Sequence, residues 1–245
     1  MTGAGVRAGD IVAQVREQLR EAILLGDIRP GAKTSQAELA RDLGVGRTPL
    51  REAVRMLQDE GLVLAEPNRR VQIASLSVDD AEELYVMRIA LEVAASRITT
   101  PTLAQTDIAE LEGLMAQMAH LAAANSLALI RAPHRAFHER FVAAAGPRPC
   151  RLIAELFDHA ERYRRVYGAA APGHFNRRES EHRAMLDAAA AGDVDAVAEA
   201  IAVHYVRTAR LVVSALDPEH RLERLRITVE GVAPGAVRAF VSETF

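Results

Sequence analysis

The chain has 245 residues, of which 49% are hydrophobic and 26% are charged, and its formal net charge at pH 7 is −3. This composition is typical of a globular protein with one large or two small domains, and the net charge argues against a surface coated with basic residues. No run approaches the roughly 18 apolar residues of a membrane-spanning helix, and the N-terminal "MTGAGVRAGD" lacks the apolar stretch of a secretory signal. The single cysteine, Cys150, excludes an internal disulfide framework, so we expect a cytoplasmic protein without a membrane partner.

Residues 1–75 predict three helices followed by two short strands. The helices are expected over residues 10–25, 35–43 and 47–61, and the second begins with the capping box Ser-Gln-Ala-Glu. The runs "LVLAE" and "VQIAS" then alternate in the manner of strands around the turn "PNRR". This order of elements is that of a winged helix-turn-helix domain.

The third predicted helix carries a row of arginines. Arg47, Arg51 and Arg55 are spaced by four residues and share one face, whereas leucine and valine side chains occupy another. The apolar face should pack against the first two helices, which leaves the arginine row in solvent. Because the planar donor fork of arginine matches phosphates and guanine edges, we expect this helix to bind double-stranded DNA.

The predicted wing adds further basic residues, and the start of a recognition helix is the part that meets base edges. The candidate DNA-contacting residues are Arg47, Thr48, Arg51, Arg55, Arg69 and Arg70. The alternative for any single arginine is a solvated side chain, and Arg55 can instead form an i, i+4 ion pair with Asp59. A row of three arginines followed by a basic wing favours contact with DNA.

The string "LARDLGVGRTPLREAVRMLQDEGLV" closely resembles the DNA-binding domain of the GntR family of bacterial transcriptional regulators. The resemblance implies that Arg47, Thr48 and Arg51 contact operator DNA and that the wing around Arg69 assists. It further implies a homodimer that binds a palindromic operator and acts as a repressor, because protein symmetry is mirrored in the half-sites. We accordingly expect a cytoplasmic protein associated with the nucleoid.

Three positions depart from the family pattern. Gly46 replaces the common serine, and glycine is still an acceptable N-cap. Ala37 stands where some members carry a DNA-contacting arginine, so no contact is assigned there. Arg70 occupies a wing-tip position that is usually glycine, which alters the expected depth and shape of the wing contact.

After Val78 the sequence is rich in alanine, leucine and glutamate, and it predicts about six helices in an all-α bundle. The stretch from Val78 to Leu216 resembles the FCD domain, the ligand-binding domain of the FadR-type branch of the family. Its motifs follow in order as "LYVMRIALE", "HRAFHERFVAAAG", "EHRAMLDAAAAGD" and "AIAVHYV". We therefore predict a mostly α protein with a winged helix-turn-helix domain over 1–75, an FCD-like helical domain over 76–217 and an extension over 218–245.

Histidines lie in these motifs. In metal-binding members an aspartate and three histidines hold one divalent ion, and the resemblance maps this set to His134, His138, His182 and His204, with His134 replacing the aspartate. Imidazole suits zinc and nickel, so we expect one of these ions as cofactor. The alternative for each histidine is a packed or surface role. Pro133 lies inside the predicted helix and is expected to kink it beside the pair.

By the same resemblance, the metal helps to hold a small organic acid as effector. Arg88 is a candidate second anchor because a guanidinium pairs well with a carboxylate, and its alternative role is an ion pair with Glu92 on the same helix face. Two other hypotheses are a regulator for which the metal itself is the signal and a zinc-dependent enzyme. The sequence lacks a general-base motif such as H-E-x-x-H, so we expect no catalytic residues and no enzyme.

The last segment, residues 218–245, matches no family motif. Its run "RLRITVEGV" alternates, which places Leu225, Ile227 and Val229 on one side of a strand. We expect this segment to add a strand, to pack on a dimer partner or to stay mobile, and the alternative is an extension without function.

Overall fold

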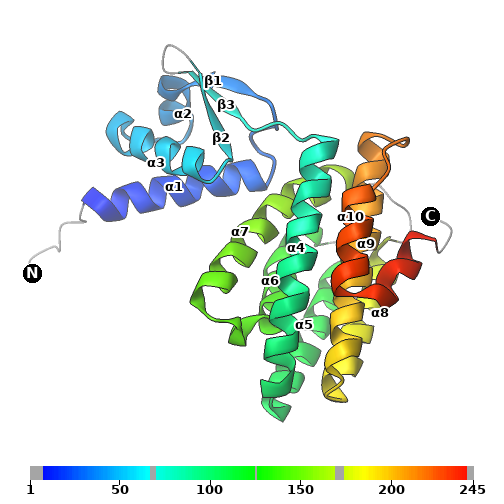
Figure 1. The fold of residues 1–245 in the computed structure, drawn as a ribbon. Helices are drawn as coiled ribbons and strands as arrows, with labels where there is room; N and C mark the ends of the chain where they lie inside the picture. Colours follow the sequence, from blue (N-terminus) through cyan, green and yellow to red (C-terminus); the bar gives the residue numbers. More distant parts are fainter. Residues whose placement is uncertain (1–7, 67–69, 125, 169–173, 242–245) are drawn as a thin grey trace, which may run out of the picture. The chain divides into compact units, whose positions relative to one another are not determined.

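Figure 1 shows the computed structural model, which describes residues 8–66, 70–124, 126–168 and 174–241. The chain divides into two compact units, Met1–Ser77 and Val78–Phe245. In the described residues, the first unit combines helices with a small sheet, and the second is built from helices. The predicted fold class, a winged helix-turn-helix followed by an all-α bundle, is confirmed.

The first unit contains three helices and a three-stranded antiparallel sheet within its described part. Its elements are α1 (Ala8–Leu24), β1 (Lys33–Ser35), α2 (Gln36–Asp42), α3 (Arg47–Asp59), β2 (Val63–Glu66) and β3 (Arg70–Ile73). The strand order is β1-β3-β2, so the predicted hairpin pairs on its far edge with β1, which the sequence did not predict. The strand β1 has only three residues and no clear alternation of polar and apolar side chains, so its sequence is too short to be recognised as a strand.

The expected capping box opens α2. The Ser35 hydroxyl accepts the backbone N–H of Glu38 at 3.1 Å, and the Glu38 carboxylate accepts the backbone N–H of Ser35 at 2.9 Å. These bonds satisfy backbone donors that have no partner within the helix. Packing then fixes α3, because Leu50 and Leu57 are completely buried among apolar residues of α1, α2 and the sheet.

The second unit is a helical bundle in which α4 packs against α7, α9 and α10 (Figure 1). Its α-helices are α4 (Val78–Thr99), α5 (Gln105–Ala123), α6 (Arg131–Arg140), α7 (Pro147–Tyr163), α8 (His174–Ala190), α9 (Val194–Leu216) and α10 (Glu223–Val232). Shorter segments are the 3₁₀ helices η2 (Thr100–Thr102), η3 (Leu127–Ile130), η4 (Ala143–Ala145) and η6 (Pro234–Phe240), and the π-helix η5 (Arg164–Gly168). Within the described ranges, no helix has both the length and the apolar character needed to cross a membrane.

The strand expected in the last segment is wrong, because residues Glu223–Val232 form the helix α10. Leu225 and Val229 are completely buried and lie four residues apart on one helix face, whereas Ile227 is 60% exposed. The helix packs on α4, and η6 packs on α9. The apparent alternation arises because an apolar residue, Ile227, occupies a solvent-facing position of the helix between the two buried ones.

The kink expected at Pro133 is also wrong. The helix α6 begins at Arg131, directly after η3, so the proline lies in its first turn. The first N–H groups of a helix have no partner within the helix, and proline removes nothing at this position. His134 and His138 therefore keep regular i, i+4 geometry.

Candidate DNA interface and metal centre

The arginine row of α3 lies on the exposed side of the helix, as expected. Arg47, Arg51 and Arg55 are exposed, and so is Thr48 in the first turn. Arg51 approaches the carboxylate of its neighbour Glu52 at 3.5 Å, but its side chain remains 64% exposed. The opposite face is buried, so packing fixes the helix and leaves the guanidinium groups available for a ligand.

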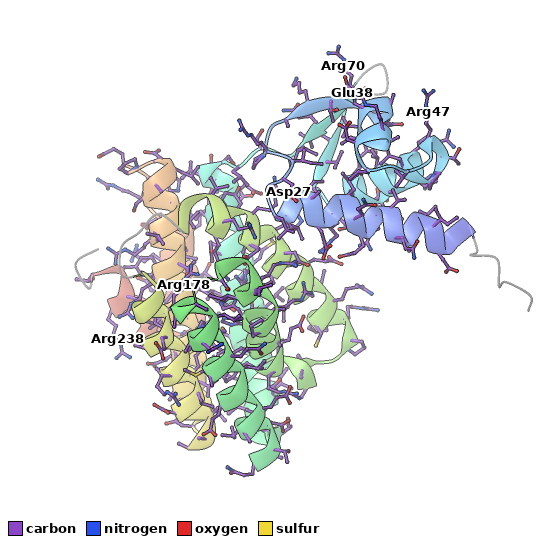
Figure 2. All side chains as sticks on the ribbon, turned by 180° about the vertical axis from the view of Figure 1, so that it is seen from behind. Asp27, Glu38, Arg47, Arg70, Arg178 and Arg238 are labelled. Carbon is purple, nitrogen blue, oxygen red and sulfur yellow. The ribbon has the colours of Figure 1, made fainter. Side chains whose placement is uncertain are left out.

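In the wing, Arg70 is the exposed first residue of β3 and pairs across the sheet with Ser35 and Glu66. Figure 2 shows the side chains of Arg70 and Arg47 projecting outward from the first unit. Arg69, the other candidate in the wing, lies outside the described residues. Three strands thus support Arg70 at the base of the wing turn.

The four candidate histidines come together in the core of the second unit, although they lie on three helices. His134 and His138 come from α6, His182 from α8 and His204 from α9. All four are at most 5% exposed, and one ring nitrogen from each lies within 4.8 Å of the others. Folding thus brings together four side chains that span 71 positions from His134 to His204 along the chain, counting both ends.

The spacing of these nitrogens suits a divalent ion. In a tetrahedral zinc site with bonds of about 2.0–2.1 Å, ligand nitrogens lie roughly 3.3–3.4 Å apart. Nε2 of His134 and Nε2 of His138 are 3.2 Å apart. Nε2 of His182 is buried without a hydrogen-bond partner among the described residues, so this nitrogen is free to bind a metal ion.

Two of the histidines are oriented by groups behind them. Nδ1 of His204 lies 2.8 Å from the Glu181 carboxylate, and Nδ1 of His138 lies 3.1 Å from the Tyr205 hydroxyl, which donates to Glu92. In both rings, a proton on Nδ1 completes this bond and leaves the Nε2 lone pair free. Such support is the usual arrangement behind metal-binding histidines.

His134 is held in a different way. Nη1 of Arg164, in the π-helix η5, donates to its Nδ1 at 2.8 Å. In this arrangement the His134 proton lies on Nε2, the nitrogen that faces His138. Coordination through Nε2 would move that proton to Nδ1, so Arg164 would have to turn away. Three of the candidate ligands therefore have a ring nitrogen free for a metal ion, and the fourth, His134, is held by an arginine.

Burial keeps the cluster neutral. Loss of solvent lowers the pKa of His134, His138 and His182 well below the usual range, and nearby positive charges add to the effect. Burial also lowers the pKa of His204, although the Glu181 carboxylate opposes it. Neutral imidazole is the form that binds a metal ion.

Arg88 is buried, and its partners belong to the protein. Its Nε donates to Glu92 at 2.8 Å, and its Nη2 donates to the Tyr205 hydroxyl at 2.8 Å. Burial acts to lower the pKa of Arg88, but Glu92, Tyr205 and Tyr85 together raise it above its usual value, so the guanidinium stays charged. This geometry favours the ion-pair alternative over a role as effector anchor.

Sequence reasoning did not single out four residues around the histidines: Glu181, Tyr205, Arg164 and Arg178. Glu181 directly precedes His182 and Tyr205 directly follows His204, which is a weak signal for a supporting role. Arg164 and Arg178 lie outside the quoted motifs, and only the packing of helices shows that their charges act on the histidines.

Comparisons with known proteins agree with both units. Residues 11–73 match the family of bacterial regulatory proteins named gntR, and residues 83–207 match the FCD domain. The chain belongs to the GntR family. The resemblance seen in the sequence is thereby confirmed, and this GntR regulator carries an FCD domain.

An HTH-type transcriptional regulator of the TAR-I ttuE-ttuC' intergenic region in Agrobacterium vitis is 36% identical over 59% of this chain and 86% of its own. A protein of Paenarthrobacter nicotinovorans, described as a probable D-xylose utilization operon transcriptional repressor, is 29% identical over 55% and 59% of the two chains. The solved structure of Escherichia coli McbR/YncC superposes with a TM-score of 0.73 at 22% identity, over 82% of this chain and 96% of that one. This last likeness concerns the fold.

Proposed function

We propose that this regulator binds a palindromic operator as a homodimer, acts as a repressor and leaves the DNA when a small organic acid enters its FCD domain. The observation that carries the proposal is the exposed arginine row of α3, set on a helix whose other face is buried. A related protein is described as a probable D-xylose utilization operon transcriptional repressor, which is consistent with control by a metabolite.

In this proposal α3 enters the major groove. Arg47 and Thr48, in its first turn, meet base edges, and Arg51 and Arg55 follow along the groove. Arg70, with Arg69 beside it in sequence, binds the phosphate backbone next to the groove and positions the helix. A dimer repeats these contacts in the second half-site.

The FCD domain would hold a divalent ion, zinc or nickel, on its histidines. The ion supplies positive charge that attracts the carboxylate of the effector. If His134 keeps its bond to Arg164, His138, His182 and His204 hold the ion and one position stays open for that carboxylate. If all four histidines bind the ion, the site is closed, because no coordination position remains for the carboxylate of an effector.

The closed arrangement supports a second candidate function, that of a metal-sensing regulator. Four buried ring nitrogens lie within 4.8 Å of one another, which is the number of ligands that a tetrahedral site needs without any organic ligand. Release of the operator on addition of zinc or nickel alone would favour the metal sensor. Release that needs both the metal and an organic acid would favour the effector-responsive repressor.

Either signal acts only if it binds the two dimer geometries with different affinity. The ligand would favour a geometry in which the two recognition helices no longer match the spacing of the half-sites. Repression then follows where the operator overlaps a promoter.

The DNA-binding assignment can be tested with Arg51→Ala and an operator selected from random duplexes. Because a bidentate arginine contact to a base discriminates by about 1–3 kcal/mol, we expect operator affinity to fall roughly 5- to 150-fold. Arg183→Ala, an exposed arginine of the FCD domain, is the matched control. Fluorescence anisotropy measures both variants, and circular dichroism and metal content check the fold. Unchanged affinity in Arg51→Ala would rule out this helix as the recognition helix.

A further inference from the structure

Beside the histidines, buried polar atoms remain without a partner. Nε and Nη2 of Arg178, Nε of Arg164 and the hydroxyl of Tyr85 are all buried, and none of them has a hydrogen-bond partner among the described residues. A buried donor left unpaired costs on the order of 1–3 kcal/mol, and more when it is charged. Such atoms are therefore expected to meet a ligand or ordered water.

These donors come from three elements that meet at the cluster. Arg178 lies on α8 four residues before His182, so the two share a helix face. Arg164 follows α7 in the π-helix η5, a type of segment often found at functional sites, and it already contacts His134. Tyr85 lies on α4 and is completely buried.

The electrostatics show that the three groups are neighbours. Burial raises the pKa of Tyr85, and the charges of Arg164 and Arg178 are among those that oppose this rise. Burial first, and then the charge of Arg164, lowers the pKa of Arg178 to about 9. Two guanidinium groups are thus held near each other in a region that water does not reach freely.

The local carboxylates balance this charge only in part, because Glu161 and Glu181 act to raise the pKa of Arg178 but burial and the charge of Arg164 outweigh them. Glu92 is occupied by Arg88, and Glu181 is shared by His204 and Arg207. Glu161 lies 3.1 Å from Arg164, which leaves Arg178 without an ion-pair partner of its own in the described structure. A divalent ion on neutral histidines would add positive charge that no protein ligand cancels. The site as a whole therefore calls for an anion with more than one negative charge.

We propose that Arg164, Arg178 and Tyr85 form an oxyanion subsite beside the histidine cluster, and that the effector is a small dianion whose second acidic group binds there. One acidic group lies at the histidines, and the second accepts hydrogen bonds from the two guanidinium groups and the tyrosine hydroxyl. Guanidinium forks match both carboxylate and phosphate, so a dicarboxylate and a phosphorylated acid share the required chemistry. This inference rests on the proposed effector function of the FCD domain.

The subsite also connects effector and metal. Without an ion, Nη1 of Arg164 is used by Nδ1 of His134. In the arrangement with three histidines on the ion this bond is kept, and the unpartnered Nε of Arg164 is the donor that remains for the acidic group of the effector. Arg164 thus acts in two ways, because it keeps His134 from the ion, which leaves a coordination position for the first acidic group, and it offers a donor to the second.

Calorimetric titration of the zinc-loaded full chain tests the subsite with three acids. Succinate and butyrate have the same chain length and differ in one carboxylate, and phosphoglycolate replaces that second carboxylate with phosphate. We expect at least one dianion to bind about tenfold or more tightly than butyrate, the effect of one charge-assisted hydrogen bond. Preference for succinate or for phosphoglycolate identifies the second group. Equal affinity for all three acids, or no binding of any, would overturn the proposal.

The variant Arg178→Met tests the role of the subsite in binding dianions without removing any of the histidines. Because the variant removes a buried charge without an ion pair, we expect it to fold and to bind dianions no better than butyrate. Arg178→Lys keeps the charge without the fork, and we expect an intermediate loss. Arg183→Met, one residue after His182 and exposed, should retain full selectivity. Unchanged dianion preference in both Arg178 variants contradicts the assignment.

The operator affinity of the ligand-free Arg178→Met protein distinguishes this inference from the proposed function. Normal affinity, together with lost dianion selectivity, places the defect in the subsite. Metal-dependent binding of butyrate without any preference for dianions would reject the subsite while the effector-responsive regulator stands. Failure of the wild-type chain to bind any operator would reject the proposed function on its own.

Discussion

Arg164 donates a hydrogen bond to Nδ1 of His134 at 2.8 Å, and this bond sets His134 apart from the other three histidines of the cluster. His138 and His204 have an acceptor behind Nδ1, in Tyr205 and Glu181. An acceptor at Nδ1 leaves Nε2 ready for a metal ion, whereas a donor at Nδ1 places the proton on Nε2. In the proposed metal site, we therefore expect the affinity for metal to depend on a residue that is not itself a ligand.

Replacing Arg164 should tighten the binding of zinc. Arg164→Ala removes the donor that competes for Nδ1 of His134, and it also removes a positive charge beside the ion. Since groups behind metal ligands typically change affinity about 10- to 100-fold, we expect a gain within that range. Competition with a chromogenic chelator measures it, with Arg183→Ala as the control for loss of an exposed arginine. A weaker zinc affinity would mean that Arg164 supports the site instead of competing with it.

Replacing Glu181 should have the opposite effect. Its carboxylate holds Nδ1 of His204 at 2.8 Å, and Glu181→Gln loses the charge that orients this ring and favours coordination through Nε2. We expect zinc affinity to fall about tenfold or more, in line with other groups that orient metal ligands. The exposed Glu179 of the same helix provides the control, Glu179→Gln. Equal affinity in the two variants would show that His204 needs no carboxylate to bind.

The wing arginine should contribute through charge. Arg70 is exposed at the start of β3, where a side chain can reach phosphates but is not inserted with the recognition helix. Arg70→Ala is expected to weaken binding to all duplexes alike and to lower the salt slope of the binding constant by about 1. Titrations at several salt concentrations, on operator and on unrelated DNA, measure both effects. A loss confined to one operator sequence would instead assign Arg70 a contact with a base.

The sequence predicted those features that repeat along one helix. The arginine row of α3 and the pair His134 and His138 follow from the i, i+4 rule, and the family motifs supplied His182 and His204. The roles of Arg164 and Arg178 could not be predicted, because they depend on how α6, α8 and η5 pack. The hydrophobic pattern of the tail was also ambiguous, because its run of nine residues is short. The spacing of Leu225, Ile227 and Val229 fits one side of a strand, and the spacing of Leu225 and Val229 alone fits one face of a helix.

A matched pair of substitutions tests the structure of that tail. Leu225 is completely buried against α4 in the helix α10, so Leu225→Ala should destabilise the second unit by about 2–5 kcal/mol. Ile227 is 60% exposed, and Ile227→Ala should change stability by no more than about 0.5 kcal/mol. Denaturant unfolding followed by circular dichroism measures the two variants. In a strand, Leu225 and Ile227 would face the same side and lose similar stability, so equal losses would contradict the helix and its packing on α4.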